Sequence, residues 1–238
     1  MSNDLKTAVI PAAGMGTRFG KRTALMPKAF IAVDGVPMII RSIDTLLSCG
    51  IEKIIIGTGF CPQPFEELKP LYPQIQTCFS ERYEMTNSLW TLCNCKDAIG
   101  EDPFLLLESD ILYEKRAVTE LLRDGRSDIL LASGETKFQD QYFVEYDASH
   151  RLTNCSTRRG QLTVCGELVG IHKLSSSFYQ SLCAYYEKIK YFQPQLGYEF
   201  GLLFVSQNIT PLHVHKIDGL KWYEIDDEDD LNYVRKNG

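Results

Sequence analysis

The sequence predicts an α/β fold, in which a Rossmann-like mixed, mainly parallel sheet is flanked by helices and followed by a C-terminal mixed extension of strands and helices. Two observations support this prediction. Short apolar runs alternate with longer amphipathic segments through the first half of the chain, a pattern typical of a parallel sheet covered on both faces. Near Phe143 the pattern changes to strands with shorter connections. We therefore expect a single domain over residues 1–238, with a first half at 1–135 and a second half at 136–238.

In the first half, strand-like and helix-like segments follow one another in regular order. The expected strands are Lys6–Ile10, Lys53–Gly57, Ile75–Phe79, Phe104–Glu108 and Asp128–Ala132. The expected helices are Pro37–Cys49, Pro64–Leu71, Ser88–Ile99 and Lys115–Arg123. Because ligands of such sheets bind at the carboxyl ends of the strands, the segments 11–30 and 108–110 should lie on the same rim.

The second half is expected to be less regular. Antiparallel strands are predicted within residues 144–155, 161–174 and 211–217, with helices at Ser176–Lys190 and near Gln195–Ser206. A final helix is predicted at Asp227–Arg235, where an acidic first turn complements the helix dipole.

The composition excludes several functional classes. The chain has 238 residues, 44% apolar residues and a formal net charge of −6, which argues against non-specific nucleic-acid binding because that requires a basic face. The N-terminal residues carry no secretory pattern, and no apolar run approaches the length of a membrane span. The eight cysteines include no CxxC pair. We expect a soluble, cytoplasmic protein with free thiols.

The segment Pro11–Phe30, PAAGMGTRFGKRTALMPKAF, combines glycines and alanines with cations directly after an apolar run. Small residues allow backbone N–H groups to approach phosphates closely. The guanidinium of Arg18 offers a planar fork for phosphate oxygens, and Lys28, held behind Pro27, supplies a point charge. This pattern predicts a site for a small anionic ligand, whereas a solvated surface loop would not require so many small residues beside cations.

Two familiar phosphate loops do not fit this segment. The dinucleotide fingerprint requires a third Gly or Ala where this chain has Phe19. A Walker loop requires Gly-Lys-Ser/Thr, which is absent from the segment.

The pattern AAGMGTR…PK resembles the signature of nucleotidyltransferases that make activated sugars and alcohols, GxGxR followed downstream by PK. Within that superfamily the chain is most similar to bacterial phosphocholine cytidylyltransferases and 2-aminoethylphosphonate cytidylyltransferases. The resemblance implies a nucleotide-diphospho-sugar transferase-like fold, with nucleotide binding in the first half and acceptor binding in the second. The nucleotide contacts that it implies are Ala12, Ala13, Gly14, Met15, Gly16, Thr17, Arg18, Lys28, Asn87, Ser88 and Glu108.

Carboxylates at two strand ends suggest a metal site. Glu108 and Asp110 follow the apolar run FLLL, and the resemblance implies that Asp110 binds Mg²⁺ together with Asp226 of the segment Glu224-Ile225-Asp226. The alternative for Asp110 is a helix-capping or turn residue. Ser88 has two compatible expected roles, as a contact of the base and as the N-cap of the helix that begins there.

The second half of the chain supplies candidates for the acceptor end of the site. The candidates are Tyr142, Tyr198, Glu199 and Glu224, which offer aromatic faces and carboxylates to an ammonium group. Each aromatic residue taken alone is more typical of a core. This mixture suits a trimethylammonium group and a primary ammonium group equally, so the acceptor is left open between phosphocholine and 2-aminoethylphosphonate.

The expected reaction is transfer of CMP from CTP to a small phosphorylated or phosphonylated amino-alcohol, with release of pyrophosphate. The expected catalytic residues are Lys28, Arg18, Asp110 and Asp226, acting by positioning and charge stabilisation. The alternatives are a sugar-1-phosphate nucleotidyltransferase that uses UTP, dTTP or GTP, and a non-catalytic nucleotide-sensing module. The four histidines are expected to be structural, and both a homo-oligomer and fusion to another enzyme domain remain open.

Overall fold

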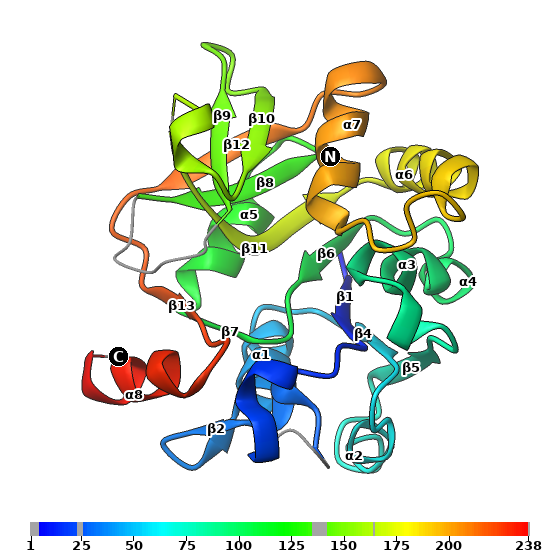
Figure 1. Cartoon of the computed structure of the whole chain (residues 1–238), viewed down its shortest axis with the longest axis vertical. Coiled ribbons are helices and arrows are strands. Elements are labelled where there is room, and N and C mark those ends of the chain that lie inside the picture. Colours follow the sequence, from blue (N-terminus) through cyan, green and yellow to red (C-terminus); the bar gives the residue numbers. More distant parts are fainter. Residues whose placement is uncertain (1–4, 23–25, 135–141, 164, 238) are drawn as a thin grey trace.

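Helices pack on both faces of one large sheet (Figure 1). The computed structural model describes residues 5–22, 26–134, 142–163 and 165–237, and nine strands within these ranges form this sheet. Successive residues of a strand point to opposite faces, so Ala8 and Ile10 lie in one hydrophobic cluster and Val9 in the other. The first cluster includes residues of α1 (Met38–Ser48) and α5 (Arg116–Arg123), and the second includes residues of α3 (Ser88–Asn94), α6 (Ser176–Ile189) and α7 (Tyr198–Asn208). The predicted α/β class is confirmed.

The centre of the sheet is parallel. Strand β1 (Thr7–Ala12) pairs in parallel with β4 (Lys53–Thr58) and with β6 (Phe104–Leu107), and β4 pairs in parallel with β5 (Ile75–Phe79). These strands lie within two residues of the predicted ranges. Their carboxyl ends form the rim from which the loops after β1 and β6 emerge.

The second half of the chain extends the same sheet. The strands are β8 (Ile129–Ser133), β9 (Phe143–Tyr146), β10 (Leu152–Ser156), β11 (Gly166–Leu174) and β12 (His213–Ile217). Strand β11 is antiparallel to β6, β8 and β9, and β10 is antiparallel to β9. Strand β12 pairs in parallel with β8, so the prediction of an antiparallel strand there was wrong in direction. The long connection through α6 and α7 returns the chain in the direction of β8, as parallel pairing requires.

Several predicted helices change their bounds. The helix expected at 64–71 is the short α2 (Gln63–Glu66), since Pro70 and Pro73 restrict the backbone that follows. The helix expected at 88–99 is divided into α3 and α4 (Lys96–Ile99). Helix α7 starts at Tyr198, after the N-cap Gly197, and the last helix is α8 (Glu228–Asn237). The remaining short elements are β2 (Ala32–Val33), β3 (Val36–Pro37) and the 3-10 helices η1 (Thr17–Arg22), η2 (Lys28–Phe30), η3 (Tyr83–Met85) and η4 (Arg159–Gln161).

A small ribbon joins the middle of the chain to its C-terminal segment. Strand β7 (Ile111–Tyr113) pairs antiparallel with β13 (Trp222–Glu224), and the N–H of Ile225 donates a 3.0 Å hydrogen bond to the carbonyl of Asp110. A separate apolar cluster joins Phe19 and Ile31 to Ile225 and to Leu231 of α8. The ribbon and this cluster therefore hold the loop after β1, the loop after β6 and the segment after β13 together.

All eight cysteines are free thiols, as the sequence predicts. Within the described ranges no helix is both long enough and apolar enough to cross a bilayer. The predicted boundary between the two halves, at residues 135 and 136, lies outside the described residues.

Candidate active site

A pocket of about 400 Å³ lies at the carboxyl ends of β1 and β6. Three groups of residues line it: the loop after β1, the segment around the start of α3, and the acidic residues that follow β6, begin α7 and end or follow β13. The lining residues include Ala12, Ala13, Gly14, Gly16, Thr17, Arg18, Lys28, Asn87, Ser88, Glu108, Asp110, Tyr198, Glu199, Glu224 and Asp226. The structure therefore brings together segments that are far apart in the sequence.

The loop after β1 approaches its neighbours closely because its residues are small. A Cβ atom at Gly59 would lie 2.8 Å from the Cβ of Ala13 and 2.6 Å from the Cβ of Tyr83, so this position admits only glycine without rearrangement. Gly16 has a φ of 58°, in the left-handed region that glycine adopts readily. The loop thus presents its backbone to the pocket with few side chains in between.

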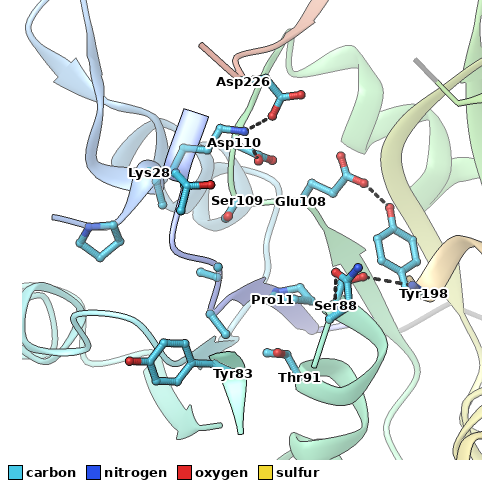
Figure 2. A pocket seen from close by; sticks show the side chains of 18 of the residues that line it. Pro11, Lys28, Tyr83, Ser88, Thr91, Glu108, Ser109, Asp110, Tyr198 and Asp226 are labelled. Atoms are coloured by element: carbon cyan, nitrogen blue, oxygen red, sulfur yellow. Dashed lines mark hydrogen bonds and ion pairs between the residues drawn. The ribbon is translucent and has the colours of Figure 1, made fainter. Parts of the chain in front are cut away.

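Lys28 lies between two carboxylates. Its Nζ donates a 2.6 Å hydrogen bond to Asp110 Oδ2 and a second, shorter one to Asp226 Oδ1 (Figure 2). Burial alone would lower the pKa of Lys28, but the charges of Asp110 and Asp226 and their hydrogen bonds outweigh it and raise this pKa above its usual range. Arg18 Nη1 lies 2.8 Å from Asp226 Oδ2. Two cations of the segment Pro11–Phe30 therefore contact the two carboxylates that the resemblance assigns to Mg²⁺.

A second acidic group lies beside this ion-pair cluster. Glu108, Asp110 and Glu224 each offer a carboxylate oxygen within 4.8 Å of the others. Burial, together with the charges of Glu224 and Asp110, raises the pKa of Glu108 well above its usual range. Burial and the charges of Asp110 and Asp226 raise the pKa of Glu224 to about 8. Crowded carboxylates of this kind require a cation or protons to balance their charge.

Hard carboxylate oxygens at this spacing suit a cation such as Mg²⁺. Glu108, Asp110 and Glu224 fit such an ion by the chemistry of their donors. Asp226 does not belong to this group of closely spaced oxygens, and its carboxylate contacts Lys28 and Arg18. The sequence-based pair of Asp110 and Asp226 thus differs from the set of oxygens that lie closest together.

Glu108 ends a hydrogen-bonded chain that starts in the core. The hydroxyl of Tyr198 donates a 2.5 Å hydrogen bond to Glu108 Oε1, and the same hydroxyl lies 3.1 Å from His172 Nε2 (Figure 2 shows the Tyr198–Glu108 pair). Burial lowers the pKa of His172 to about 3, so its imidazole is neutral. Because the hydroxyl of Tyr198 donates to Glu108, its oxygen accepts a hydrogen bond from His172 Nε2–H. The sequence predicts a structural role for His172, and this pair of contacts links it to the pocket.

The N-terminus of α3 has a different cap from the one expected. Asn87 is the N-cap, and its side chain accepts a 2.7 Å hydrogen bond from the N–H of Ser88. The hydroxyl of Ser88 accepts a 3.0 Å hydrogen bond from the N–H of Tyr198. Ser88 therefore ties α3 to the start of α7 rather than capping its own helix, while both Asn87 and Ser88 line the pocket.

Two residues that the resemblance assigned to the site are absent from the described pocket lining. Met15 is 40% exposed and is absent from the pocket lining among the described residues. Tyr142 packs edge-on against Phe200, with ring centroids 5.8 Å apart, and it is likewise absent from the described lining. Other lining residues were not predicted from the sequence; they are Pro11, Pro27, Ala29, Tyr83, Thr86, Thr91 and Ser109. All seven lie inside or beside segments that contain predicted site residues.

A family comparison accounts for this arrangement. The family model described as the MobA-like NTP transferase domain matches residues 8–172. The chain belongs to the MobA-like NTP transferase family. The match runs from β1 into β11 and includes the phosphate loop, Lys28 and Asp110, whereas Tyr198, Glu199, Glu224 and Asp226 follow it. The predicted membership in a nucleotidyltransferase family is confirmed.

Individual relatives of this MobA-like NTP transferase carry related names. A 2-aminoethylphosphonate cytidylyltransferase of Lancefieldella rimae is 32% identical over 112 residues, which is 47% of this chain and 46% of that protein. The chain thus matches less than half the length of that relative. A choline-phosphate cytidylyltransferase of Streptococcus pneumoniae is 26% identical over 97% of this chain and 98% of that protein.

Solved structures agree on the fold of this MobA-like NTP transferase. A CTP:phosphocholine cytidylyltransferase from Streptococcus pneumoniae superposes with a TM-score of 0.80 at 21% identity, over 98% of this chain and 99% of that one. An inositol-1-phosphate CTP transferase from T. maritima has a TM-score of 0.83 at 17% identity, over 100% and 99% of the two chains.

Proposed function

We propose that the chain transfers CMP from CTP to a phosphate or phosphonate oxygen of a small zwitterionic amino-alcohol derivative and releases pyrophosphate. One observation carries the proposal: a single pocket has cations beside a small-residue loop at one side and buried or half-buried carboxylates at another. A nucleoside triphosphate suits the first side, and an ammonium group suits the second. The names of the relatives from Lancefieldella rimae and Streptococcus pneumoniae support the same reading.

In this proposal the chain acts by positioning and charge stabilisation. An oxygen of the acceptor forms a bond to the α-phosphorus of CTP while the bond from that phosphorus to the bridging oxygen of the β-phosphate breaks. Lys28 and Arg18 stabilise the negative charge that moves onto the leaving pyrophosphate. The attacking oxygen is already anionic, so the reaction needs no strong general base.

Mg²⁺ belongs to the proposal as a bound cation. Asp110 would hold it, with Glu108, Glu224 or Asp226 as further ligands, and its charge would stabilise phosphate oxygens. Lys28 then serves two states of the enzyme: it neutralises Asp110 and Asp226 before substrates bind, and it is available to phosphate oxygens afterwards. The proposed setting is the cytoplasm, where free thiols persist.

The test measures pyrophosphate release with each of the four NTPs against phosphocholine, 2-aminoethylphosphonate and several sugar 1-phosphates, with and without Mg²⁺. The expected result is turnover with CTP, Mg²⁺ and an ammonium-bearing acceptor. Asp110→Asn should remove this turnover and serves as the inactive control. Turnover with a sugar 1-phosphate and UTP, dTTP or GTP would contradict the proposal. CTP binding without turnover on any acceptor would also contradict it and would indicate a nucleotide-sensing module.

A further inference from the structure

Glu199 has an unusual position in the pocket. It is the second residue of α7, it lines the pocket, and it is only 8% exposed. Its Oε2 is buried and has no hydrogen-bond partner among the described residues. Burial raises the pKa of Glu199, and a hydrogen bond from its own backbone lowers it in part. Oε2 is left without a donor among these residues, and a buried carboxylate oxygen in that state is costly unless a bound group donates to it.

The chain makes room for this carboxylate. A Cβ atom at residue 197 would collide with Glu199 Oε2 and would lie 3.4 Å from Glu199 Cδ, and the residue there is Gly197. The φ of Gly197 is −70°, which other residues adopt without strain. Its missing side chain, rather than its backbone conformation, is therefore what accommodates the carboxylate.

The other carboxylates of the pocket already have cations or donors nearby. Glu108 accepts a hydrogen bond from Tyr198, and Lys28 contacts both Asp110 and Asp226. Glu224 is close enough to Lys28 for this cation to lower its pKa in part. Among the described acids of the pocket, Glu199 is the one with a buried oxygen that awaits a donor.

The described pocket lining includes few aromatic side chains, although Tyr142 behind it is close enough for the charge of Glu199, after burial, to raise the pKa of its hydroxyl. Tyr83 and Tyr198 are the aromatic residues of the described lining, and Figure 2 shows Tyr83 at the opposite end of the pocket from Glu108. Tyr198 is 2% exposed and packs edge-on against His172, with centroids 5.4 Å apart. Trp222 is buried, and its Nε1 donates to Ser133 Oγ. Quaternary ammonium groups are recognised by several aromatic faces, which this part of the described lining does not provide.

We infer that the acceptor carries a primary ammonium group, that Glu199 accepts its N–H hydrogen bonds, and that a trimethylammonium group is disfavoured. This inference rests on the proposed function and selects one acceptor class within it. A trimethylammonium group has the charge but no N–H, so it would leave Glu199 Oε2 unsatisfied. A site built to hydrogen-bond a donor rejects analogues that lack the donor.

The test is a methylation series of one acceptor: phosphoethanolamine, its N-methyl and N,N-dimethyl derivatives, and phosphocholine. All four carry a positive charge, while the number of N–H groups falls from three to none. With CTP, we expect kcat/KM to fall along the series and to drop about 10- to 100-fold at the last methylation, the range of one charged hydrogen bond. Equal or higher kcat/KM with phosphocholine would overturn the inference.

Two variants assign the selectivity to the carboxylate. Glu199→Gln should raise the KM for phosphoethanolamine about 10- to 100-fold, leave the KM for CTP unchanged and flatten the series. Gly197→Ala should have the same effect because it displaces the carboxylate without removing it. Glu101→Gln, at an exposed acid outside this pocket, is the matched control. An unchanged series in Glu199→Gln would overturn the role of this residue.

A binding measurement separates this inference from the proposed function. Calorimetric titration of the four acceptors into the chain with α,β-methylene-CTP reports binding without turnover. Absence of turnover with every NTP and acceptor would defeat the proposed function, and the titration would then decide the inference. Tighter binding of phosphoethanolamine than of phosphocholine supports it, and equal binding of the two overturns it.

Discussion

At the scale of single residues, Lys28 has the largest influence on the charge of the site. It contacts both Asp110 and Asp226, and these carboxylates raise its pKa, so it is a fixed cation at any ordinary pH. Lys28→Met keeps most of the length of the side chain and removes the charge. We expect kcat to fall at least about 100-fold, as for loss of a preorganised charge-stabilising group. Steady-state pyrophosphate release measures this effect.

The control for Lys28→Met is Lys69→Met. Lys69 forms an exposed ion pair with Glu66 on α2, and pairs of this kind contribute little to stability. Its substitution should leave kcat unchanged. Turnover near the wild-type rate in a folded Lys28→Met protein would contradict the role of Lys28, and a thermal melt of each variant checks that it is folded.

Glu199 gives a second residue-scale prediction, concerning stability and pH. Burial, and to a smaller extent the charge of Asp110, raises its pKa from 4.5 to about 7. The pKa of Glu199 is higher in the folded protein than in the unfolded chain. Protonation of Glu199 therefore favours the folded protein. This contribution to the free energy of unfolding is complete below about pH 4.5 and is lost as the pH rises through 7. Glu199 should therefore destabilise the ligand-free protein by up to about 3 kcal/mol at pH 8.

Chemical denaturation of wild type and Glu199→Gln between pH 5 and pH 8.5 measures this term. Gln has the shape of Glu and cannot ionise. The free energy of unfolding of Glu199→Gln should therefore increase relative to that of wild type as the pH rises. Comparing the two proteins at each pH removes the shared contributions of the other titrating groups, such as Glu108 and Glu224. A difference that stays constant with pH would show that Glu199 does not titrate in this window.

At the scale of elements, the irregular strand β11 shapes the acidic part of the site. Its register with β8 shifts between Leu168 and His172, and Gly170 within this shift has a φ of 77°. The carbonyl of Gly170 accepts a 2.9 Å hydrogen bond from the N–H of Glu108. A Cβ atom at this position would collide with Glu108 Oε2. The bulge therefore provides both the backbone contact and the space for the Glu108 side chain.

Gly170→Ala should accordingly impair both stability and activity. We expect a loss of about 1–2 kcal/mol from the unfavourable positive φ, a further loss from the collision with Glu108, and a lower kcat. Gly50→Ala is the control, because Gly50 also has a positive φ, 88°, with open space around a would-be Cβ. Gly50→Ala should lose only the stability that the positive φ costs, and it should keep its kcat. Equal effects of the two substitutions on kcat would contradict the contact with Glu108.

At the scale of the whole molecule, the sequence predicts what is local better than what is long-range. The strands β1, β4, β5 and β6 were predicted to within two residues, because a strand buried on both faces reads as a continuous apolar run. The direction of β12 depends on where the chain returns after α6 and α7, and no local pattern records this. The Lys28 bridge to Asp226 spans 198 positions in the sequence. Motifs identified both residues, but only the fold places them in contact.

The same long-range contacts predict how substrates stabilise the molecule. Lys28 and Arg18 form ion pairs with Asp110 and Asp226, so Mg²⁺ alone must compete with these cations. When CTP is present, its phosphates offer these cations another partner. We therefore expect Mg²⁺ alone to change Tm little and CTP with Mg²⁺ to raise it by more than the two separate shifts combined. At 100 times Kd the gain is about 2.7 kcal/mol, or roughly 5–10 °C for a chain of this size.

Thermal melts with EDTA, with Mg²⁺, with CTP and EDTA, and with CTP and Mg²⁺ test this coupling. Asp226→Asn removes one of the two carboxylates that Lys28 contacts, which should reduce the extra shift that Mg²⁺ and CTP give together. The Lys69→Met protein should respond like wild type, since its ion pair is exposed and distant in sequence from these carboxylates. A full rise in Tm with Mg²⁺ alone would contradict this coupling, because it would mean that the metal binds without competing with Lys28.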